Sequence, residues 1–412
     1  MKNILIWMFD GLPLYRANIN RNNSNINLPN YNKLIEKGVH YSNVIATAPS
    51  TAMSLTSMFT GLYVHELGRR SYSNEDSEIP SDTVSLFKDL ENQGYNTYVL
   101  WDAELETGNP IKYKINAWSG SNTKFKHFRR KSKSKSILGK ISHKVTAISH
   151  KVTAKKGGDW LLGELNYFID NEFSGPWAAF VRFGPELGER YTKSSNEVTN
   201  YIPDNELFQF DSVIGEFFSK SREDLKVIIC EDHGKMLGEN GILSYAFNLM
   251  EGTLYTPILV VDSDLPHCII DKTISLSNFK NIVLDREVQY TKYIYADSGY
   301  ADQWHRKTMV RKGKWKYIYN RDEWPVKEQL FDLDTDPNEM INLAQTYYVD
   351  PYRDNRPKGD TVSKLNSPSG LSIDGEKLCN VIPRSDWKDV LIILDELREE
   401  RLRVWELQGV KY

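Results

Sequence analysis

Short apolar segments alternate with amphipathic segments over most of the chain, and this alternation limits the possible folds more than any other feature of the sequence. Apolar runs of strand length occupy residues 3–9, 38–45, 96–101, 177–183, 225–230 and 254–261. Helix-type spacing of apolar residues occurs at 30–37, 54–60, 84–93, 160–169 and 205–219. Strands that alternate with helices predict an α/β fold, a three-layer sandwich whose central sheet is mostly parallel.

The pattern changes after about residue 300. Residues 307–319 alternate in the manner of antiparallel strands, and residues 387–404 have the spacing of an amphipathic helix. We therefore expect a main domain over residues 1–300 and a smaller subdomain over residues 301–412, built on an antiparallel sheet and a closing helix.

Composition excludes several classes of protein. The 412 residues carry a formal charge of −3 and a mean hydropathy of −0.51, and no apolar run approaches the ~20 residues that span a bilayer. Residues 4–9 are too short for the apolar part of a signal peptide. The three cysteines are widely spaced and form no metal-binding pattern. These features predict a cytoplasmic protein without a transmembrane segment.

A strongly basic segment interrupts the α/β pattern. Residues 124–156 contain twelve Lys or Arg and no Asp or Glu, which leaves about −15 on the rest of the chain. Within it, the heptad ISHKVTA of residues 141–147 is repeated at 148–154. The segment is either a solvated surface insertion or an arm that attracts an anionic substrate or surface by charge.

Two predicted strands end in residues that bind metals. Asp232 and His233 follow the buried strand at 225–230, and Asp10 follows the first strand. Open α/β sheets place ligands at the carboxyl ends of their strands, so these three side chains can converge on one cation, and the donors suit zinc, manganese or calcium. The alternative is an Asp that caps a turn beside an exposed His.

A run of hydroxyl side chains leads into the predicted helix at 54–60. Thr47, Ser50 and Thr51 lie at this strand-to-helix turn, where free N–H groups favour anions. A metal-bound hydroxyl becomes a nucleophile. The alternative is a helix cap made of Ser and Thr.

In this order the motifs resemble the sulfatase branch of the alkaline phosphatase superfamily. They cover most of residues 3–344 and comprise Asp10-Gly11, Thr47-x-Pro49-Ser50, Thr60-Gly61, Asp232-His233-Gly234, Gly238-Glu239-x-Gly241 and Asp336-Pro337-x-Glu339. The resemblance implies a catalytic domain over residues 1–300, and its C-terminal motifs match the predicted subdomain.

Departures from the family pattern point to phosphorus chemistry. Sulfatases oxidise a Cys or Ser to formylglycine where Thr47 stands here, and their following Arg is Thr51. Threonine cannot give that aldehyde, so the chain looks like the members that handle phosphate or phosphonate esters. The resemblance implies one divalent cation held by Asp10, Thr47, Asp232 and His233, with a phosphothreonine intermediate on Thr47. A second cation lacks obvious ligands.

Four further residues are candidates for binding the substrate: Arg182, Glu186, Lys235 and His305. The expected substrate is an anionic ester of a small molecule, a glycan or a lipid head group, handled by a hydrolase such as a phosphodiesterase or by a transferase. Nucleic acid is not expected, and the sequence does not indicate an oligomeric state. Two alternatives stay open: a sulfuric ester hydrolase, and an inactive member of the family that only binds an anion.

Overall fold

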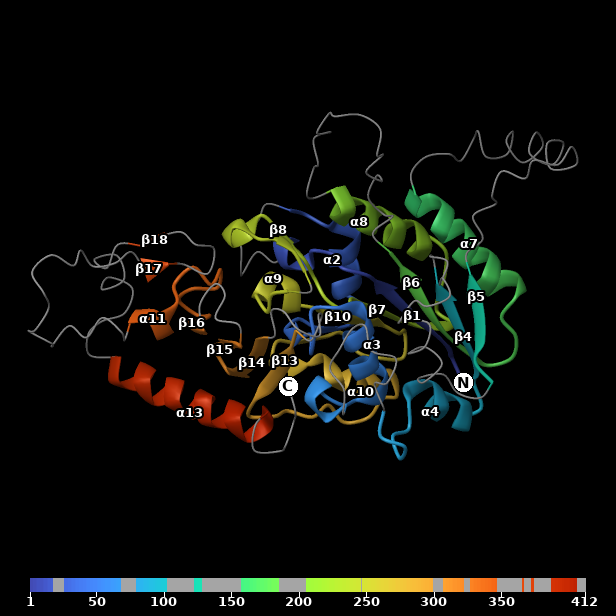
Figure 1. The fold of residues 1–412 in the computed structure, drawn as a ribbon. Helices are drawn as coiled ribbons and strands as arrows, with labels where there is room; N and C mark the ends of the chain where they lie inside the picture. The colour runs from blue at the N-terminus through green and yellow to red at the C-terminus, as the bar shows by residue number, and fades with distance from the viewer. Residues whose placement is uncertain are drawn as a thin grey trace, which may run out of the picture.

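The computed structural model describes most of the chain and places its longest strands in one central sheet (Figure 1). The described residues are 1–17, 26–67, 79–101, 122–127, 157–184, 205–245, 247–298, 307–321, 327–346, 365–366, 372–373 and 387–405. The central sheet has eight strands in the order β11-β2-β10-β7-β1-β6-β4-β5.

Most neighbours in this sheet are parallel. The exception is β10, which is antiparallel to both β2 and β7. The bounds are β1 (Asn3–Phe9), β2 (Val39–Tyr41), β4 (Asn96–Trp101), β5 (Lys124–His127), β6 (Trp177–Phe183), β7 (Leu225–Cys230), β10 (Ile258–Val261) and β11 (Cys268–Ile270). The strand β1 lies between β6 and β7, parallel to both.

Helices cover both faces of the sheet, so β1 is buried on both sides. Its residues Leu5, Trp7 and Phe9 belong to a core that includes side chains of α2 (Pro29–Ile35), α7 (Gly157–Asn171) and α8 (Asn205–Phe218). The residues between them, Ile4, Ile6 and Met8, belong to the core on the opposite face of the sheet. That core includes side chains of α3 (Thr51–Thr60), α4 (Leu86–Asn92) and α10 (Phe279–Val283). Each such buried side chain contributes roughly 1.5–3 kcal/mol. The predicted three-layer α/β sandwich is confirmed.

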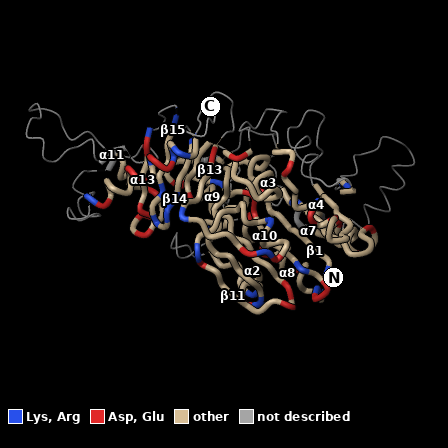
Figure 2. Tube along the Cα trace, turned by 90° about the horizontal axis from the view of Figure 1, so that it is seen from below, with Lys and Arg blue, Asp and Glu red and all other residues tan. Residues whose placement is uncertain are grey.

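The C-terminal sheet is antiparallel, as predicted. Its strands run in the order β13 (Ile294–Asp297), β14 (Lys307–Lys312), β15 (Trp315–Asn320) and β16 (Glu328–Asp332). Helix α13 (Trp387–Trp405) packs on it through a core that contains Leu397, Trp405 and Tyr317. Figure 2 shows basic and acidic residues gathered along α13, β14 and β15, whereas α3 is free of both. The sheet begins a few residues before the boundary predicted at residue 300.

Short elements connect these layers. They are η1 (Leu14–Ala17), β3 (Val44–Ile45), η2 (Val64–Glu66), β8 (Met236–Leu237), η4 (Glu239–Gly241), β9 (Leu243–Ser244), α9 (Glu251–Leu254), β12 (Ile274–Ser275), η5 (Leu276–Asn278), α11 (Leu343–Thr346), β17 (Leu365–Asn366) and β18 (Ser372–Ile373). Among the described residues, no helix has the length and apolar character needed to cross a bilayer.

Several predicted elements differ from the structure, among them the strand predicted at 38–45, which is divided into β2 and β3 in two separate sheets. The helix predicted at 54–60 begins three residues earlier, at Thr51, and ends as expected at Gly61, whose φ is +80°. The strand predicted at 254–261 is shorter, because α9 occupies residues up to Leu254 and the strand begins at Ile258. Of the basic segment, only residues 124–127 are described, as the edge strand β5. Its repeated heptads lie outside the described residues.

Candidate active site

Three residues of metal-binding type meet at the carboxyl edge of the central sheet. Asp10 follows β1, and Asp232 and His233 follow β7, the strand paired with β1. One ligand atom from each of the three lies within 4.8 Å of the other two. Asp232 and His233 are fully buried. The predicted convergence of these side chains is therefore present, because neighbouring parallel strands end at the same edge.

Arg182 of β6 holds the carboxylate of Asp10 from the other side. Its Nε donates to Oδ2 of Asp10 at 2.8 Å, and a terminal nitrogen makes a second, shorter contact with the same oxygen. The guanidinium carbon lies 4.7 Å from the ring centroid of Trp101. Arg182, which the sequence predicts to bind substrate, thus joins the cluster through its contact with Asp10.

The hydroxyl group in contact with side chains of the cluster belongs to Thr51, whereas the Ser54 hydroxyl donates to the backbone carbonyl of Asp232. Its Oγ1 lies 3.3 Å from Oδ2 of Asp10 and 3.2 Å from Nε2 of His233. Thr51 is the first residue of α3, and the extended backbone of Ser50 precedes it at the N-cap position. The N-terminus of the longest helix on this face therefore points a hydroxyl at the two ligand-type residues.

Thr47, the hydroxyl predicted from the sequence, makes no such contact. Its Oγ1 is buried and has no hydrogen-bond partner in the part of the chain that the structure describes. Its carbonyl oxygen accepts from the N–H of Asp297 at 3.0 Å. The hydroxyl that the described contacts bring to Asp10 and His233 is that of Thr51, four residues later, and the role of Thr47 as metal ligand and nucleophile stays a prediction.

The ring of His233 is oriented by the backbone that follows it. Its Nδ1 lies 2.9 Å from the carbonyl oxygen of Gly234, which can only accept, so Nδ1 carries a proton. The other ring nitrogen, Nε2, faces the cluster and lies 3.5 Å from Oδ2 of Asp232. Tyr245 stacks on the imidazole at a centroid distance of 4.9 Å. The sequence marks Ser244-Tyr245 as the place where the family often has a His after Gly-Glu-x-Gly, but it does not predict that Tyr245 stacks on His233.

The two carboxylates of the cluster have opposite pKa shifts. Burial raises the pKa of Asp232 to about 6, and the nearby charge of Asp10 adds to this effect. Burial also acts on Asp10, but the charges of Arg182 and His233 outweigh it and lower the pKa of Asp10. Among the described residues the carboxylate oxygens of Asp232 accept no well-formed hydrogen bond, although the neighbouring Thr51 hydroxyl lowers the pKa of Asp232 to a smaller extent. A buried carboxylate without a donor is costly unless a cation joins it.

The donor set fits a divalent cation. Two carboxylates and an imidazole nitrogen supply the oxygen and nitrogen ligands that zinc, manganese or calcium accept. The unpartnered oxygens of Asp232 are the observation that favours this use over a purely structural cluster.

The other predicted substrate-binding residues are not brought to the cluster by any described contact. Lys235 forms an ion pair with Glu206 of α8. Glu186 and His305 lie outside the described residues. Arg182 is the member of that group which the structure places at the site.

Comparison with known proteins identifies the family. The model of the sulfatase family matches residues 2–286. The chain belongs to the sulfatase family. This confirms the resemblance to the sulfatase family seen in the motifs.

Curated relatives of this sulfatase-family chain are distant. Choline-sulfatase of Rhizobium meliloti (strain 1021) is 28% identical over 162 residues, which are 33% of this chain and 31% of that enzyme. The match thus spans about a third of its length. Arylsulfatase K of Danio rerio is 20% identical over 423 aligned residues, covering 82% of this chain and 79% of that protein.

A solved structure agrees with the fold. The phosphonate monoester hydrolase of Agrobacterium radiobacter superposes with a TM-score of 0.58 at 13% identity, covering 85% of this chain and 93% of that one. At this identity the likeness concerns the fold alone.

Proposed function

We propose that this member of the sulfatase family is a metal-dependent hydrolase of phosphate or phosphonate esters that uses Thr51 as its nucleophile. The observation that carries the proposal is the contact of the Thr51 hydroxyl with both Asp10 and His233. Asp10, Asp232 and His233 would hold one divalent cation. This proposal gives Thr51 the nucleophilic role that the family motif predicts for Thr47.

The chemistry of threonine favours phosphorus over sulfur. Threonine is a secondary alcohol and cannot form the aldehyde with which sulfatases release sulfate. It can form a phosphate or phosphonate ester that water then hydrolyses. When bound, the cation would lower the pKa of the attacking hydroxyl and neutralise charge on the transferring group.

The residues of the chain account for the rest of the reaction. The Thr51 oxygen forms the bond to phosphorus while the bond from phosphorus to the departing alcohol oxygen breaks. The hydroxyl proton passes to Oδ2 of Asp10, which lies 3.3 Å from Oγ1 of Thr51, because Nε2 of His233 would be held by the cation, and the departing oxygen gains a proton from solvent. Water then cleaves the phosphothreonine and restores the hydroxyl. Arg182 keeps Asp10 ionised and adds positive charge beside the anionic ester.

A substrate panel tests the ester class. Wild type, Thr51→Ala and Thr47→Ala would be assayed with aryl esters of phosphate, phosphodiester, phosphonate and sulfate, with zinc, manganese or calcium added in turn. The proposal expects turnover of a phosphorus ester that needs metal and Thr51 but not Thr47. Faster turnover of the aryl sulfate would favour sulfuric ester hydrolysis. The similarity to choline-sulfatase supports that alternative.

The same panel covers the remaining alternatives. Metal binding without turnover would favour a transferase, whereas neither metal nor turnover would favour an inactive member that binds an anion. A cytoplasmic location and a role of the basic segment in attracting the substrate remain predictions from the sequence.

A further inference from the structure

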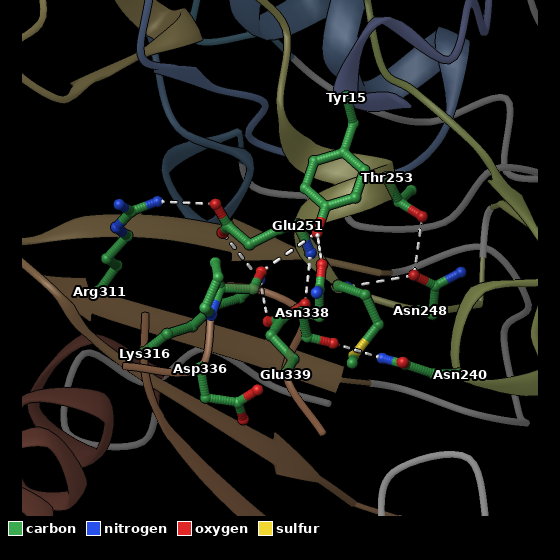
Figure 3. A network of polar contacts seen from close by, with 12 residues as sticks. Tyr15, Asn240, Asn248, Glu251, Thr253, Arg311, Lys316, Asp336, Asn338 and Glu339 are labelled. Carbon is green, nitrogen blue, oxygen red and sulfur yellow. Dashed lines mark hydrogen bonds and ion pairs between the residues drawn. The ribbon is translucent and has the colours of Figure 1, made fainter. Parts of the chain in front are cut away.

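A buried network of charges joins the C-terminal sheet to the main domain. Its four members, called here the Glu251 network, are Glu251 of α9, Arg311 of β14, Lys316 of β15 and Glu339 after β16 (Figure 3). All four side chains are buried, with residue exposures of 0%, 5%, 0% and 2%. The network pairs two positive with two negative groups.

The contacts of the network converge on Glu251. The ammonium group of Lys316 donates to Oε1 of Glu251 at 3.0 Å and lies 2.7 Å from Oε1 of Glu339. Arg311 donates to the other oxygen of Glu251 at 3.1 Å. The backbone N–H of Glu251 donates to Oε2 of Glu339 at 2.7 Å. Glu339 adopts a φ of +55°, which is uncommon for a residue with a side chain.

The network fixes a helix too short to be stable by itself. Helix α9 spans only Glu251–Leu254, and its N-cap residue Met250 supplies no side-chain cap. The Glu339 carboxylate binds the first N–H of the helix. Asn248 accepts from the N–H of Met250 at 3.1 Å and from the hydroxyl of Thr253 at 2.7 Å. Ion pairs buried this deeply add little net stability but specify one arrangement.

Helix α9 lies directly against the turn that carries His233. The N–H of Gly234 donates to the carbonyl oxygen of Thr253 at 2.8 Å. A Cβ atom at Gly234 would lie 2.4 Å from the carbonyl oxygen of Gly252, so only glycine fits there. The carbonyl of Gly234 in turn accepts from Nδ1 of His233. An unbroken chain of contacts therefore runs from Lys316 through α9 to the imidazole.

We propose that the Glu251 network positions His233 for metal binding, so that the C-terminal sheet sets the geometry of the cation site through α9. The residues of the network do not touch the site and act through Gly252, Thr253 and Gly234. This inference rests on the proposed function, because it assumes that His233 binds a cation.

The competing explanation is that the network only stabilises the fold. A matched control is the ion pair of Arg398 of α13 with Glu328 of β16, in which Nη2 lies 2.6 Å from Oε2. It belongs to the same C-terminal unit and contacts the sheet rather than α9. Loss of either pair lowers stability, whereas loss of the Glu251 network alone is expected to disturb the site.

The test measures cation affinity in folded protein. Co²⁺ would be titrated into metal-free wild type, Glu251→Gln, Glu339→Gln and Arg398→Met, at a temperature where circular dichroism shows each to be folded. We expect the Kd for Co²⁺ to rise about 10- to 100-fold in the two network variants, the usual effect of losing a group that orients a metal ligand, and to stay unchanged in Arg398→Met. Equal affinities in all four folded proteins would overturn the proposal.

A second readout needs no metal. Hydrogen exchange of the peptide that contains Gly234 would be compared in metal-free wild type and the same variants. We expect faster exchange at Gly234 in Glu251→Gln and Glu339→Gln but not in Arg398→Met. Wild-type exchange at Gly234 in both network variants would contradict the proposal. If Glu251→Gln does not fold, Glu339→Gln carries the comparison alone, since it removes the charge that pairs with Lys316.

The two proposals fail in different ways. If wild type binds no Co²⁺, zinc or manganese, the metal site of the proposed function is wrong. If wild type binds metal and the network variants bind it equally well, the function stands and the positioning role is wrong.

Discussion

The hydroxyl oxygen of Thr51 lies 3.2 Å from Nε2 of His233, although 182 positions separate the two residues in the chain. The contact joins the N-terminus of α3 to the carboxyl end of β7. It gives the cluster a potential nucleophile beside its potential metal ligands, and the predictions below depend on this arrangement.

Replacement of Thr51 separates the two candidate nucleophiles. Thr51→Ala is expected to lower kcat on phosphorus esters by about 10³-fold or more, as removal of a catalytic nucleophile does. Thr51→Ser keeps a hydroxyl and should retain part of the activity. Thr47→Ala, the matched control in the same turn, should leave kcat within about tenfold of wild type, since transition-state contacts rather than packing carry the larger losses. Steady-state kinetics measure kcat for both variants. A larger loss of kcat in Thr47→Ala than in Thr51→Ala would show that Thr47 is the nucleophile.

Neutralising Asp232 should stabilise the protein without metal. Its folded-state pKa of about 6 lies above the usual 3.8. The contribution of this group to stability is therefore present below pH 3.8 and is lost as the pH rises through 6. At pH 7, Asp232→Asn should raise the free energy of unfolding in chelator by on the order of 1–3 kcal/mol.

The control for Asp232→Asn is the same measurement with metal. There the order of stabilities should reverse, because only wild type keeps the full ligand set. Thermal unfolding at pH 7 with chelator and with zinc provides both comparisons. A variant less stable than wild type in chelator would contradict the assignment of an uncompensated buried carboxylate.

His40 should make the fold sensitive to mild acid. It is buried in β2 next to Tyr31, and its Nε2 has no partner among the described residues. Burial lowers its pKa from 6.5 to about 4. As the pH falls, His40 therefore gains its proton in the unfolded chain before it does so in the folded protein. The stability present above pH 6.5 is lost as the pH falls toward 4.

The variant His40→Leu isolates this effect. Chemical denaturation between pH 4 and 7 should show a smaller loss of stability for His40→Leu than for wild type, by on the order of 1–3 kcal/mol. Parallel curves for the two proteins would show that His40 does not carry the acid sensitivity.

Arg182 and Lys235 provide a matched pair of cations. Arg182 contacts Asp10 in the cluster, whereas Lys235 is paired with Glu206. Arg182→Gln should lower kcat/KM on an anionic ester by about 10²-fold, the scale for losing one positioned donor. Lys235→Gln should have a much smaller effect on kcat/KM. Equal losses in the two variants would show that general positive charge, rather than the Asp10 contact, matters.

Much of the fold could be predicted because its signals are local. The strand β7 is apolar except for Lys226 and ends at Cys230, two residues before Asp232, so both the strand and its functional end are visible in the sequence. The bounds of β1, β4 and β6 follow from the same kind of apolar run. Convergence of Asp10 with Asp232 then follows from the geometry of parallel strands.

The start of α3 could not be read from apolar spacing. Every residue of α3 from Thr51 to Thr60 is buried, so the helix has no polar face to mark its first turn. A helix assigned from Leu55, Met58 and Phe59 therefore begins too late, whereas the expectation that Thr47 is the nucleophile comes from its place in the family motif. The preference of serine for the N-cap would have pointed to Ser50 and hence to Thr51.

The Glu251 network had no signal in the sequence. Its partners lie 60 to 88 positions from Glu251, in separate strands and a turn. Lys316 sits in a strand that the sequence predicts, but alternation alone says nothing about which carboxylate it meets. Only the packing of the C-terminal sheet on α9 brings these charges together.

The most direct test of the central claim is to trap the covalent intermediate. Protein quenched in acid during turnover of an aryl phosphonate or phosphodiester would be digested and its peptides identified by mass spectrometry. The proposed function predicts a phosphorus adduct on Thr51 in wild type and none in Thr51→Ala. An adduct on Thr47, or turnover by Thr51→Ala at the wild-type rate, would contradict it.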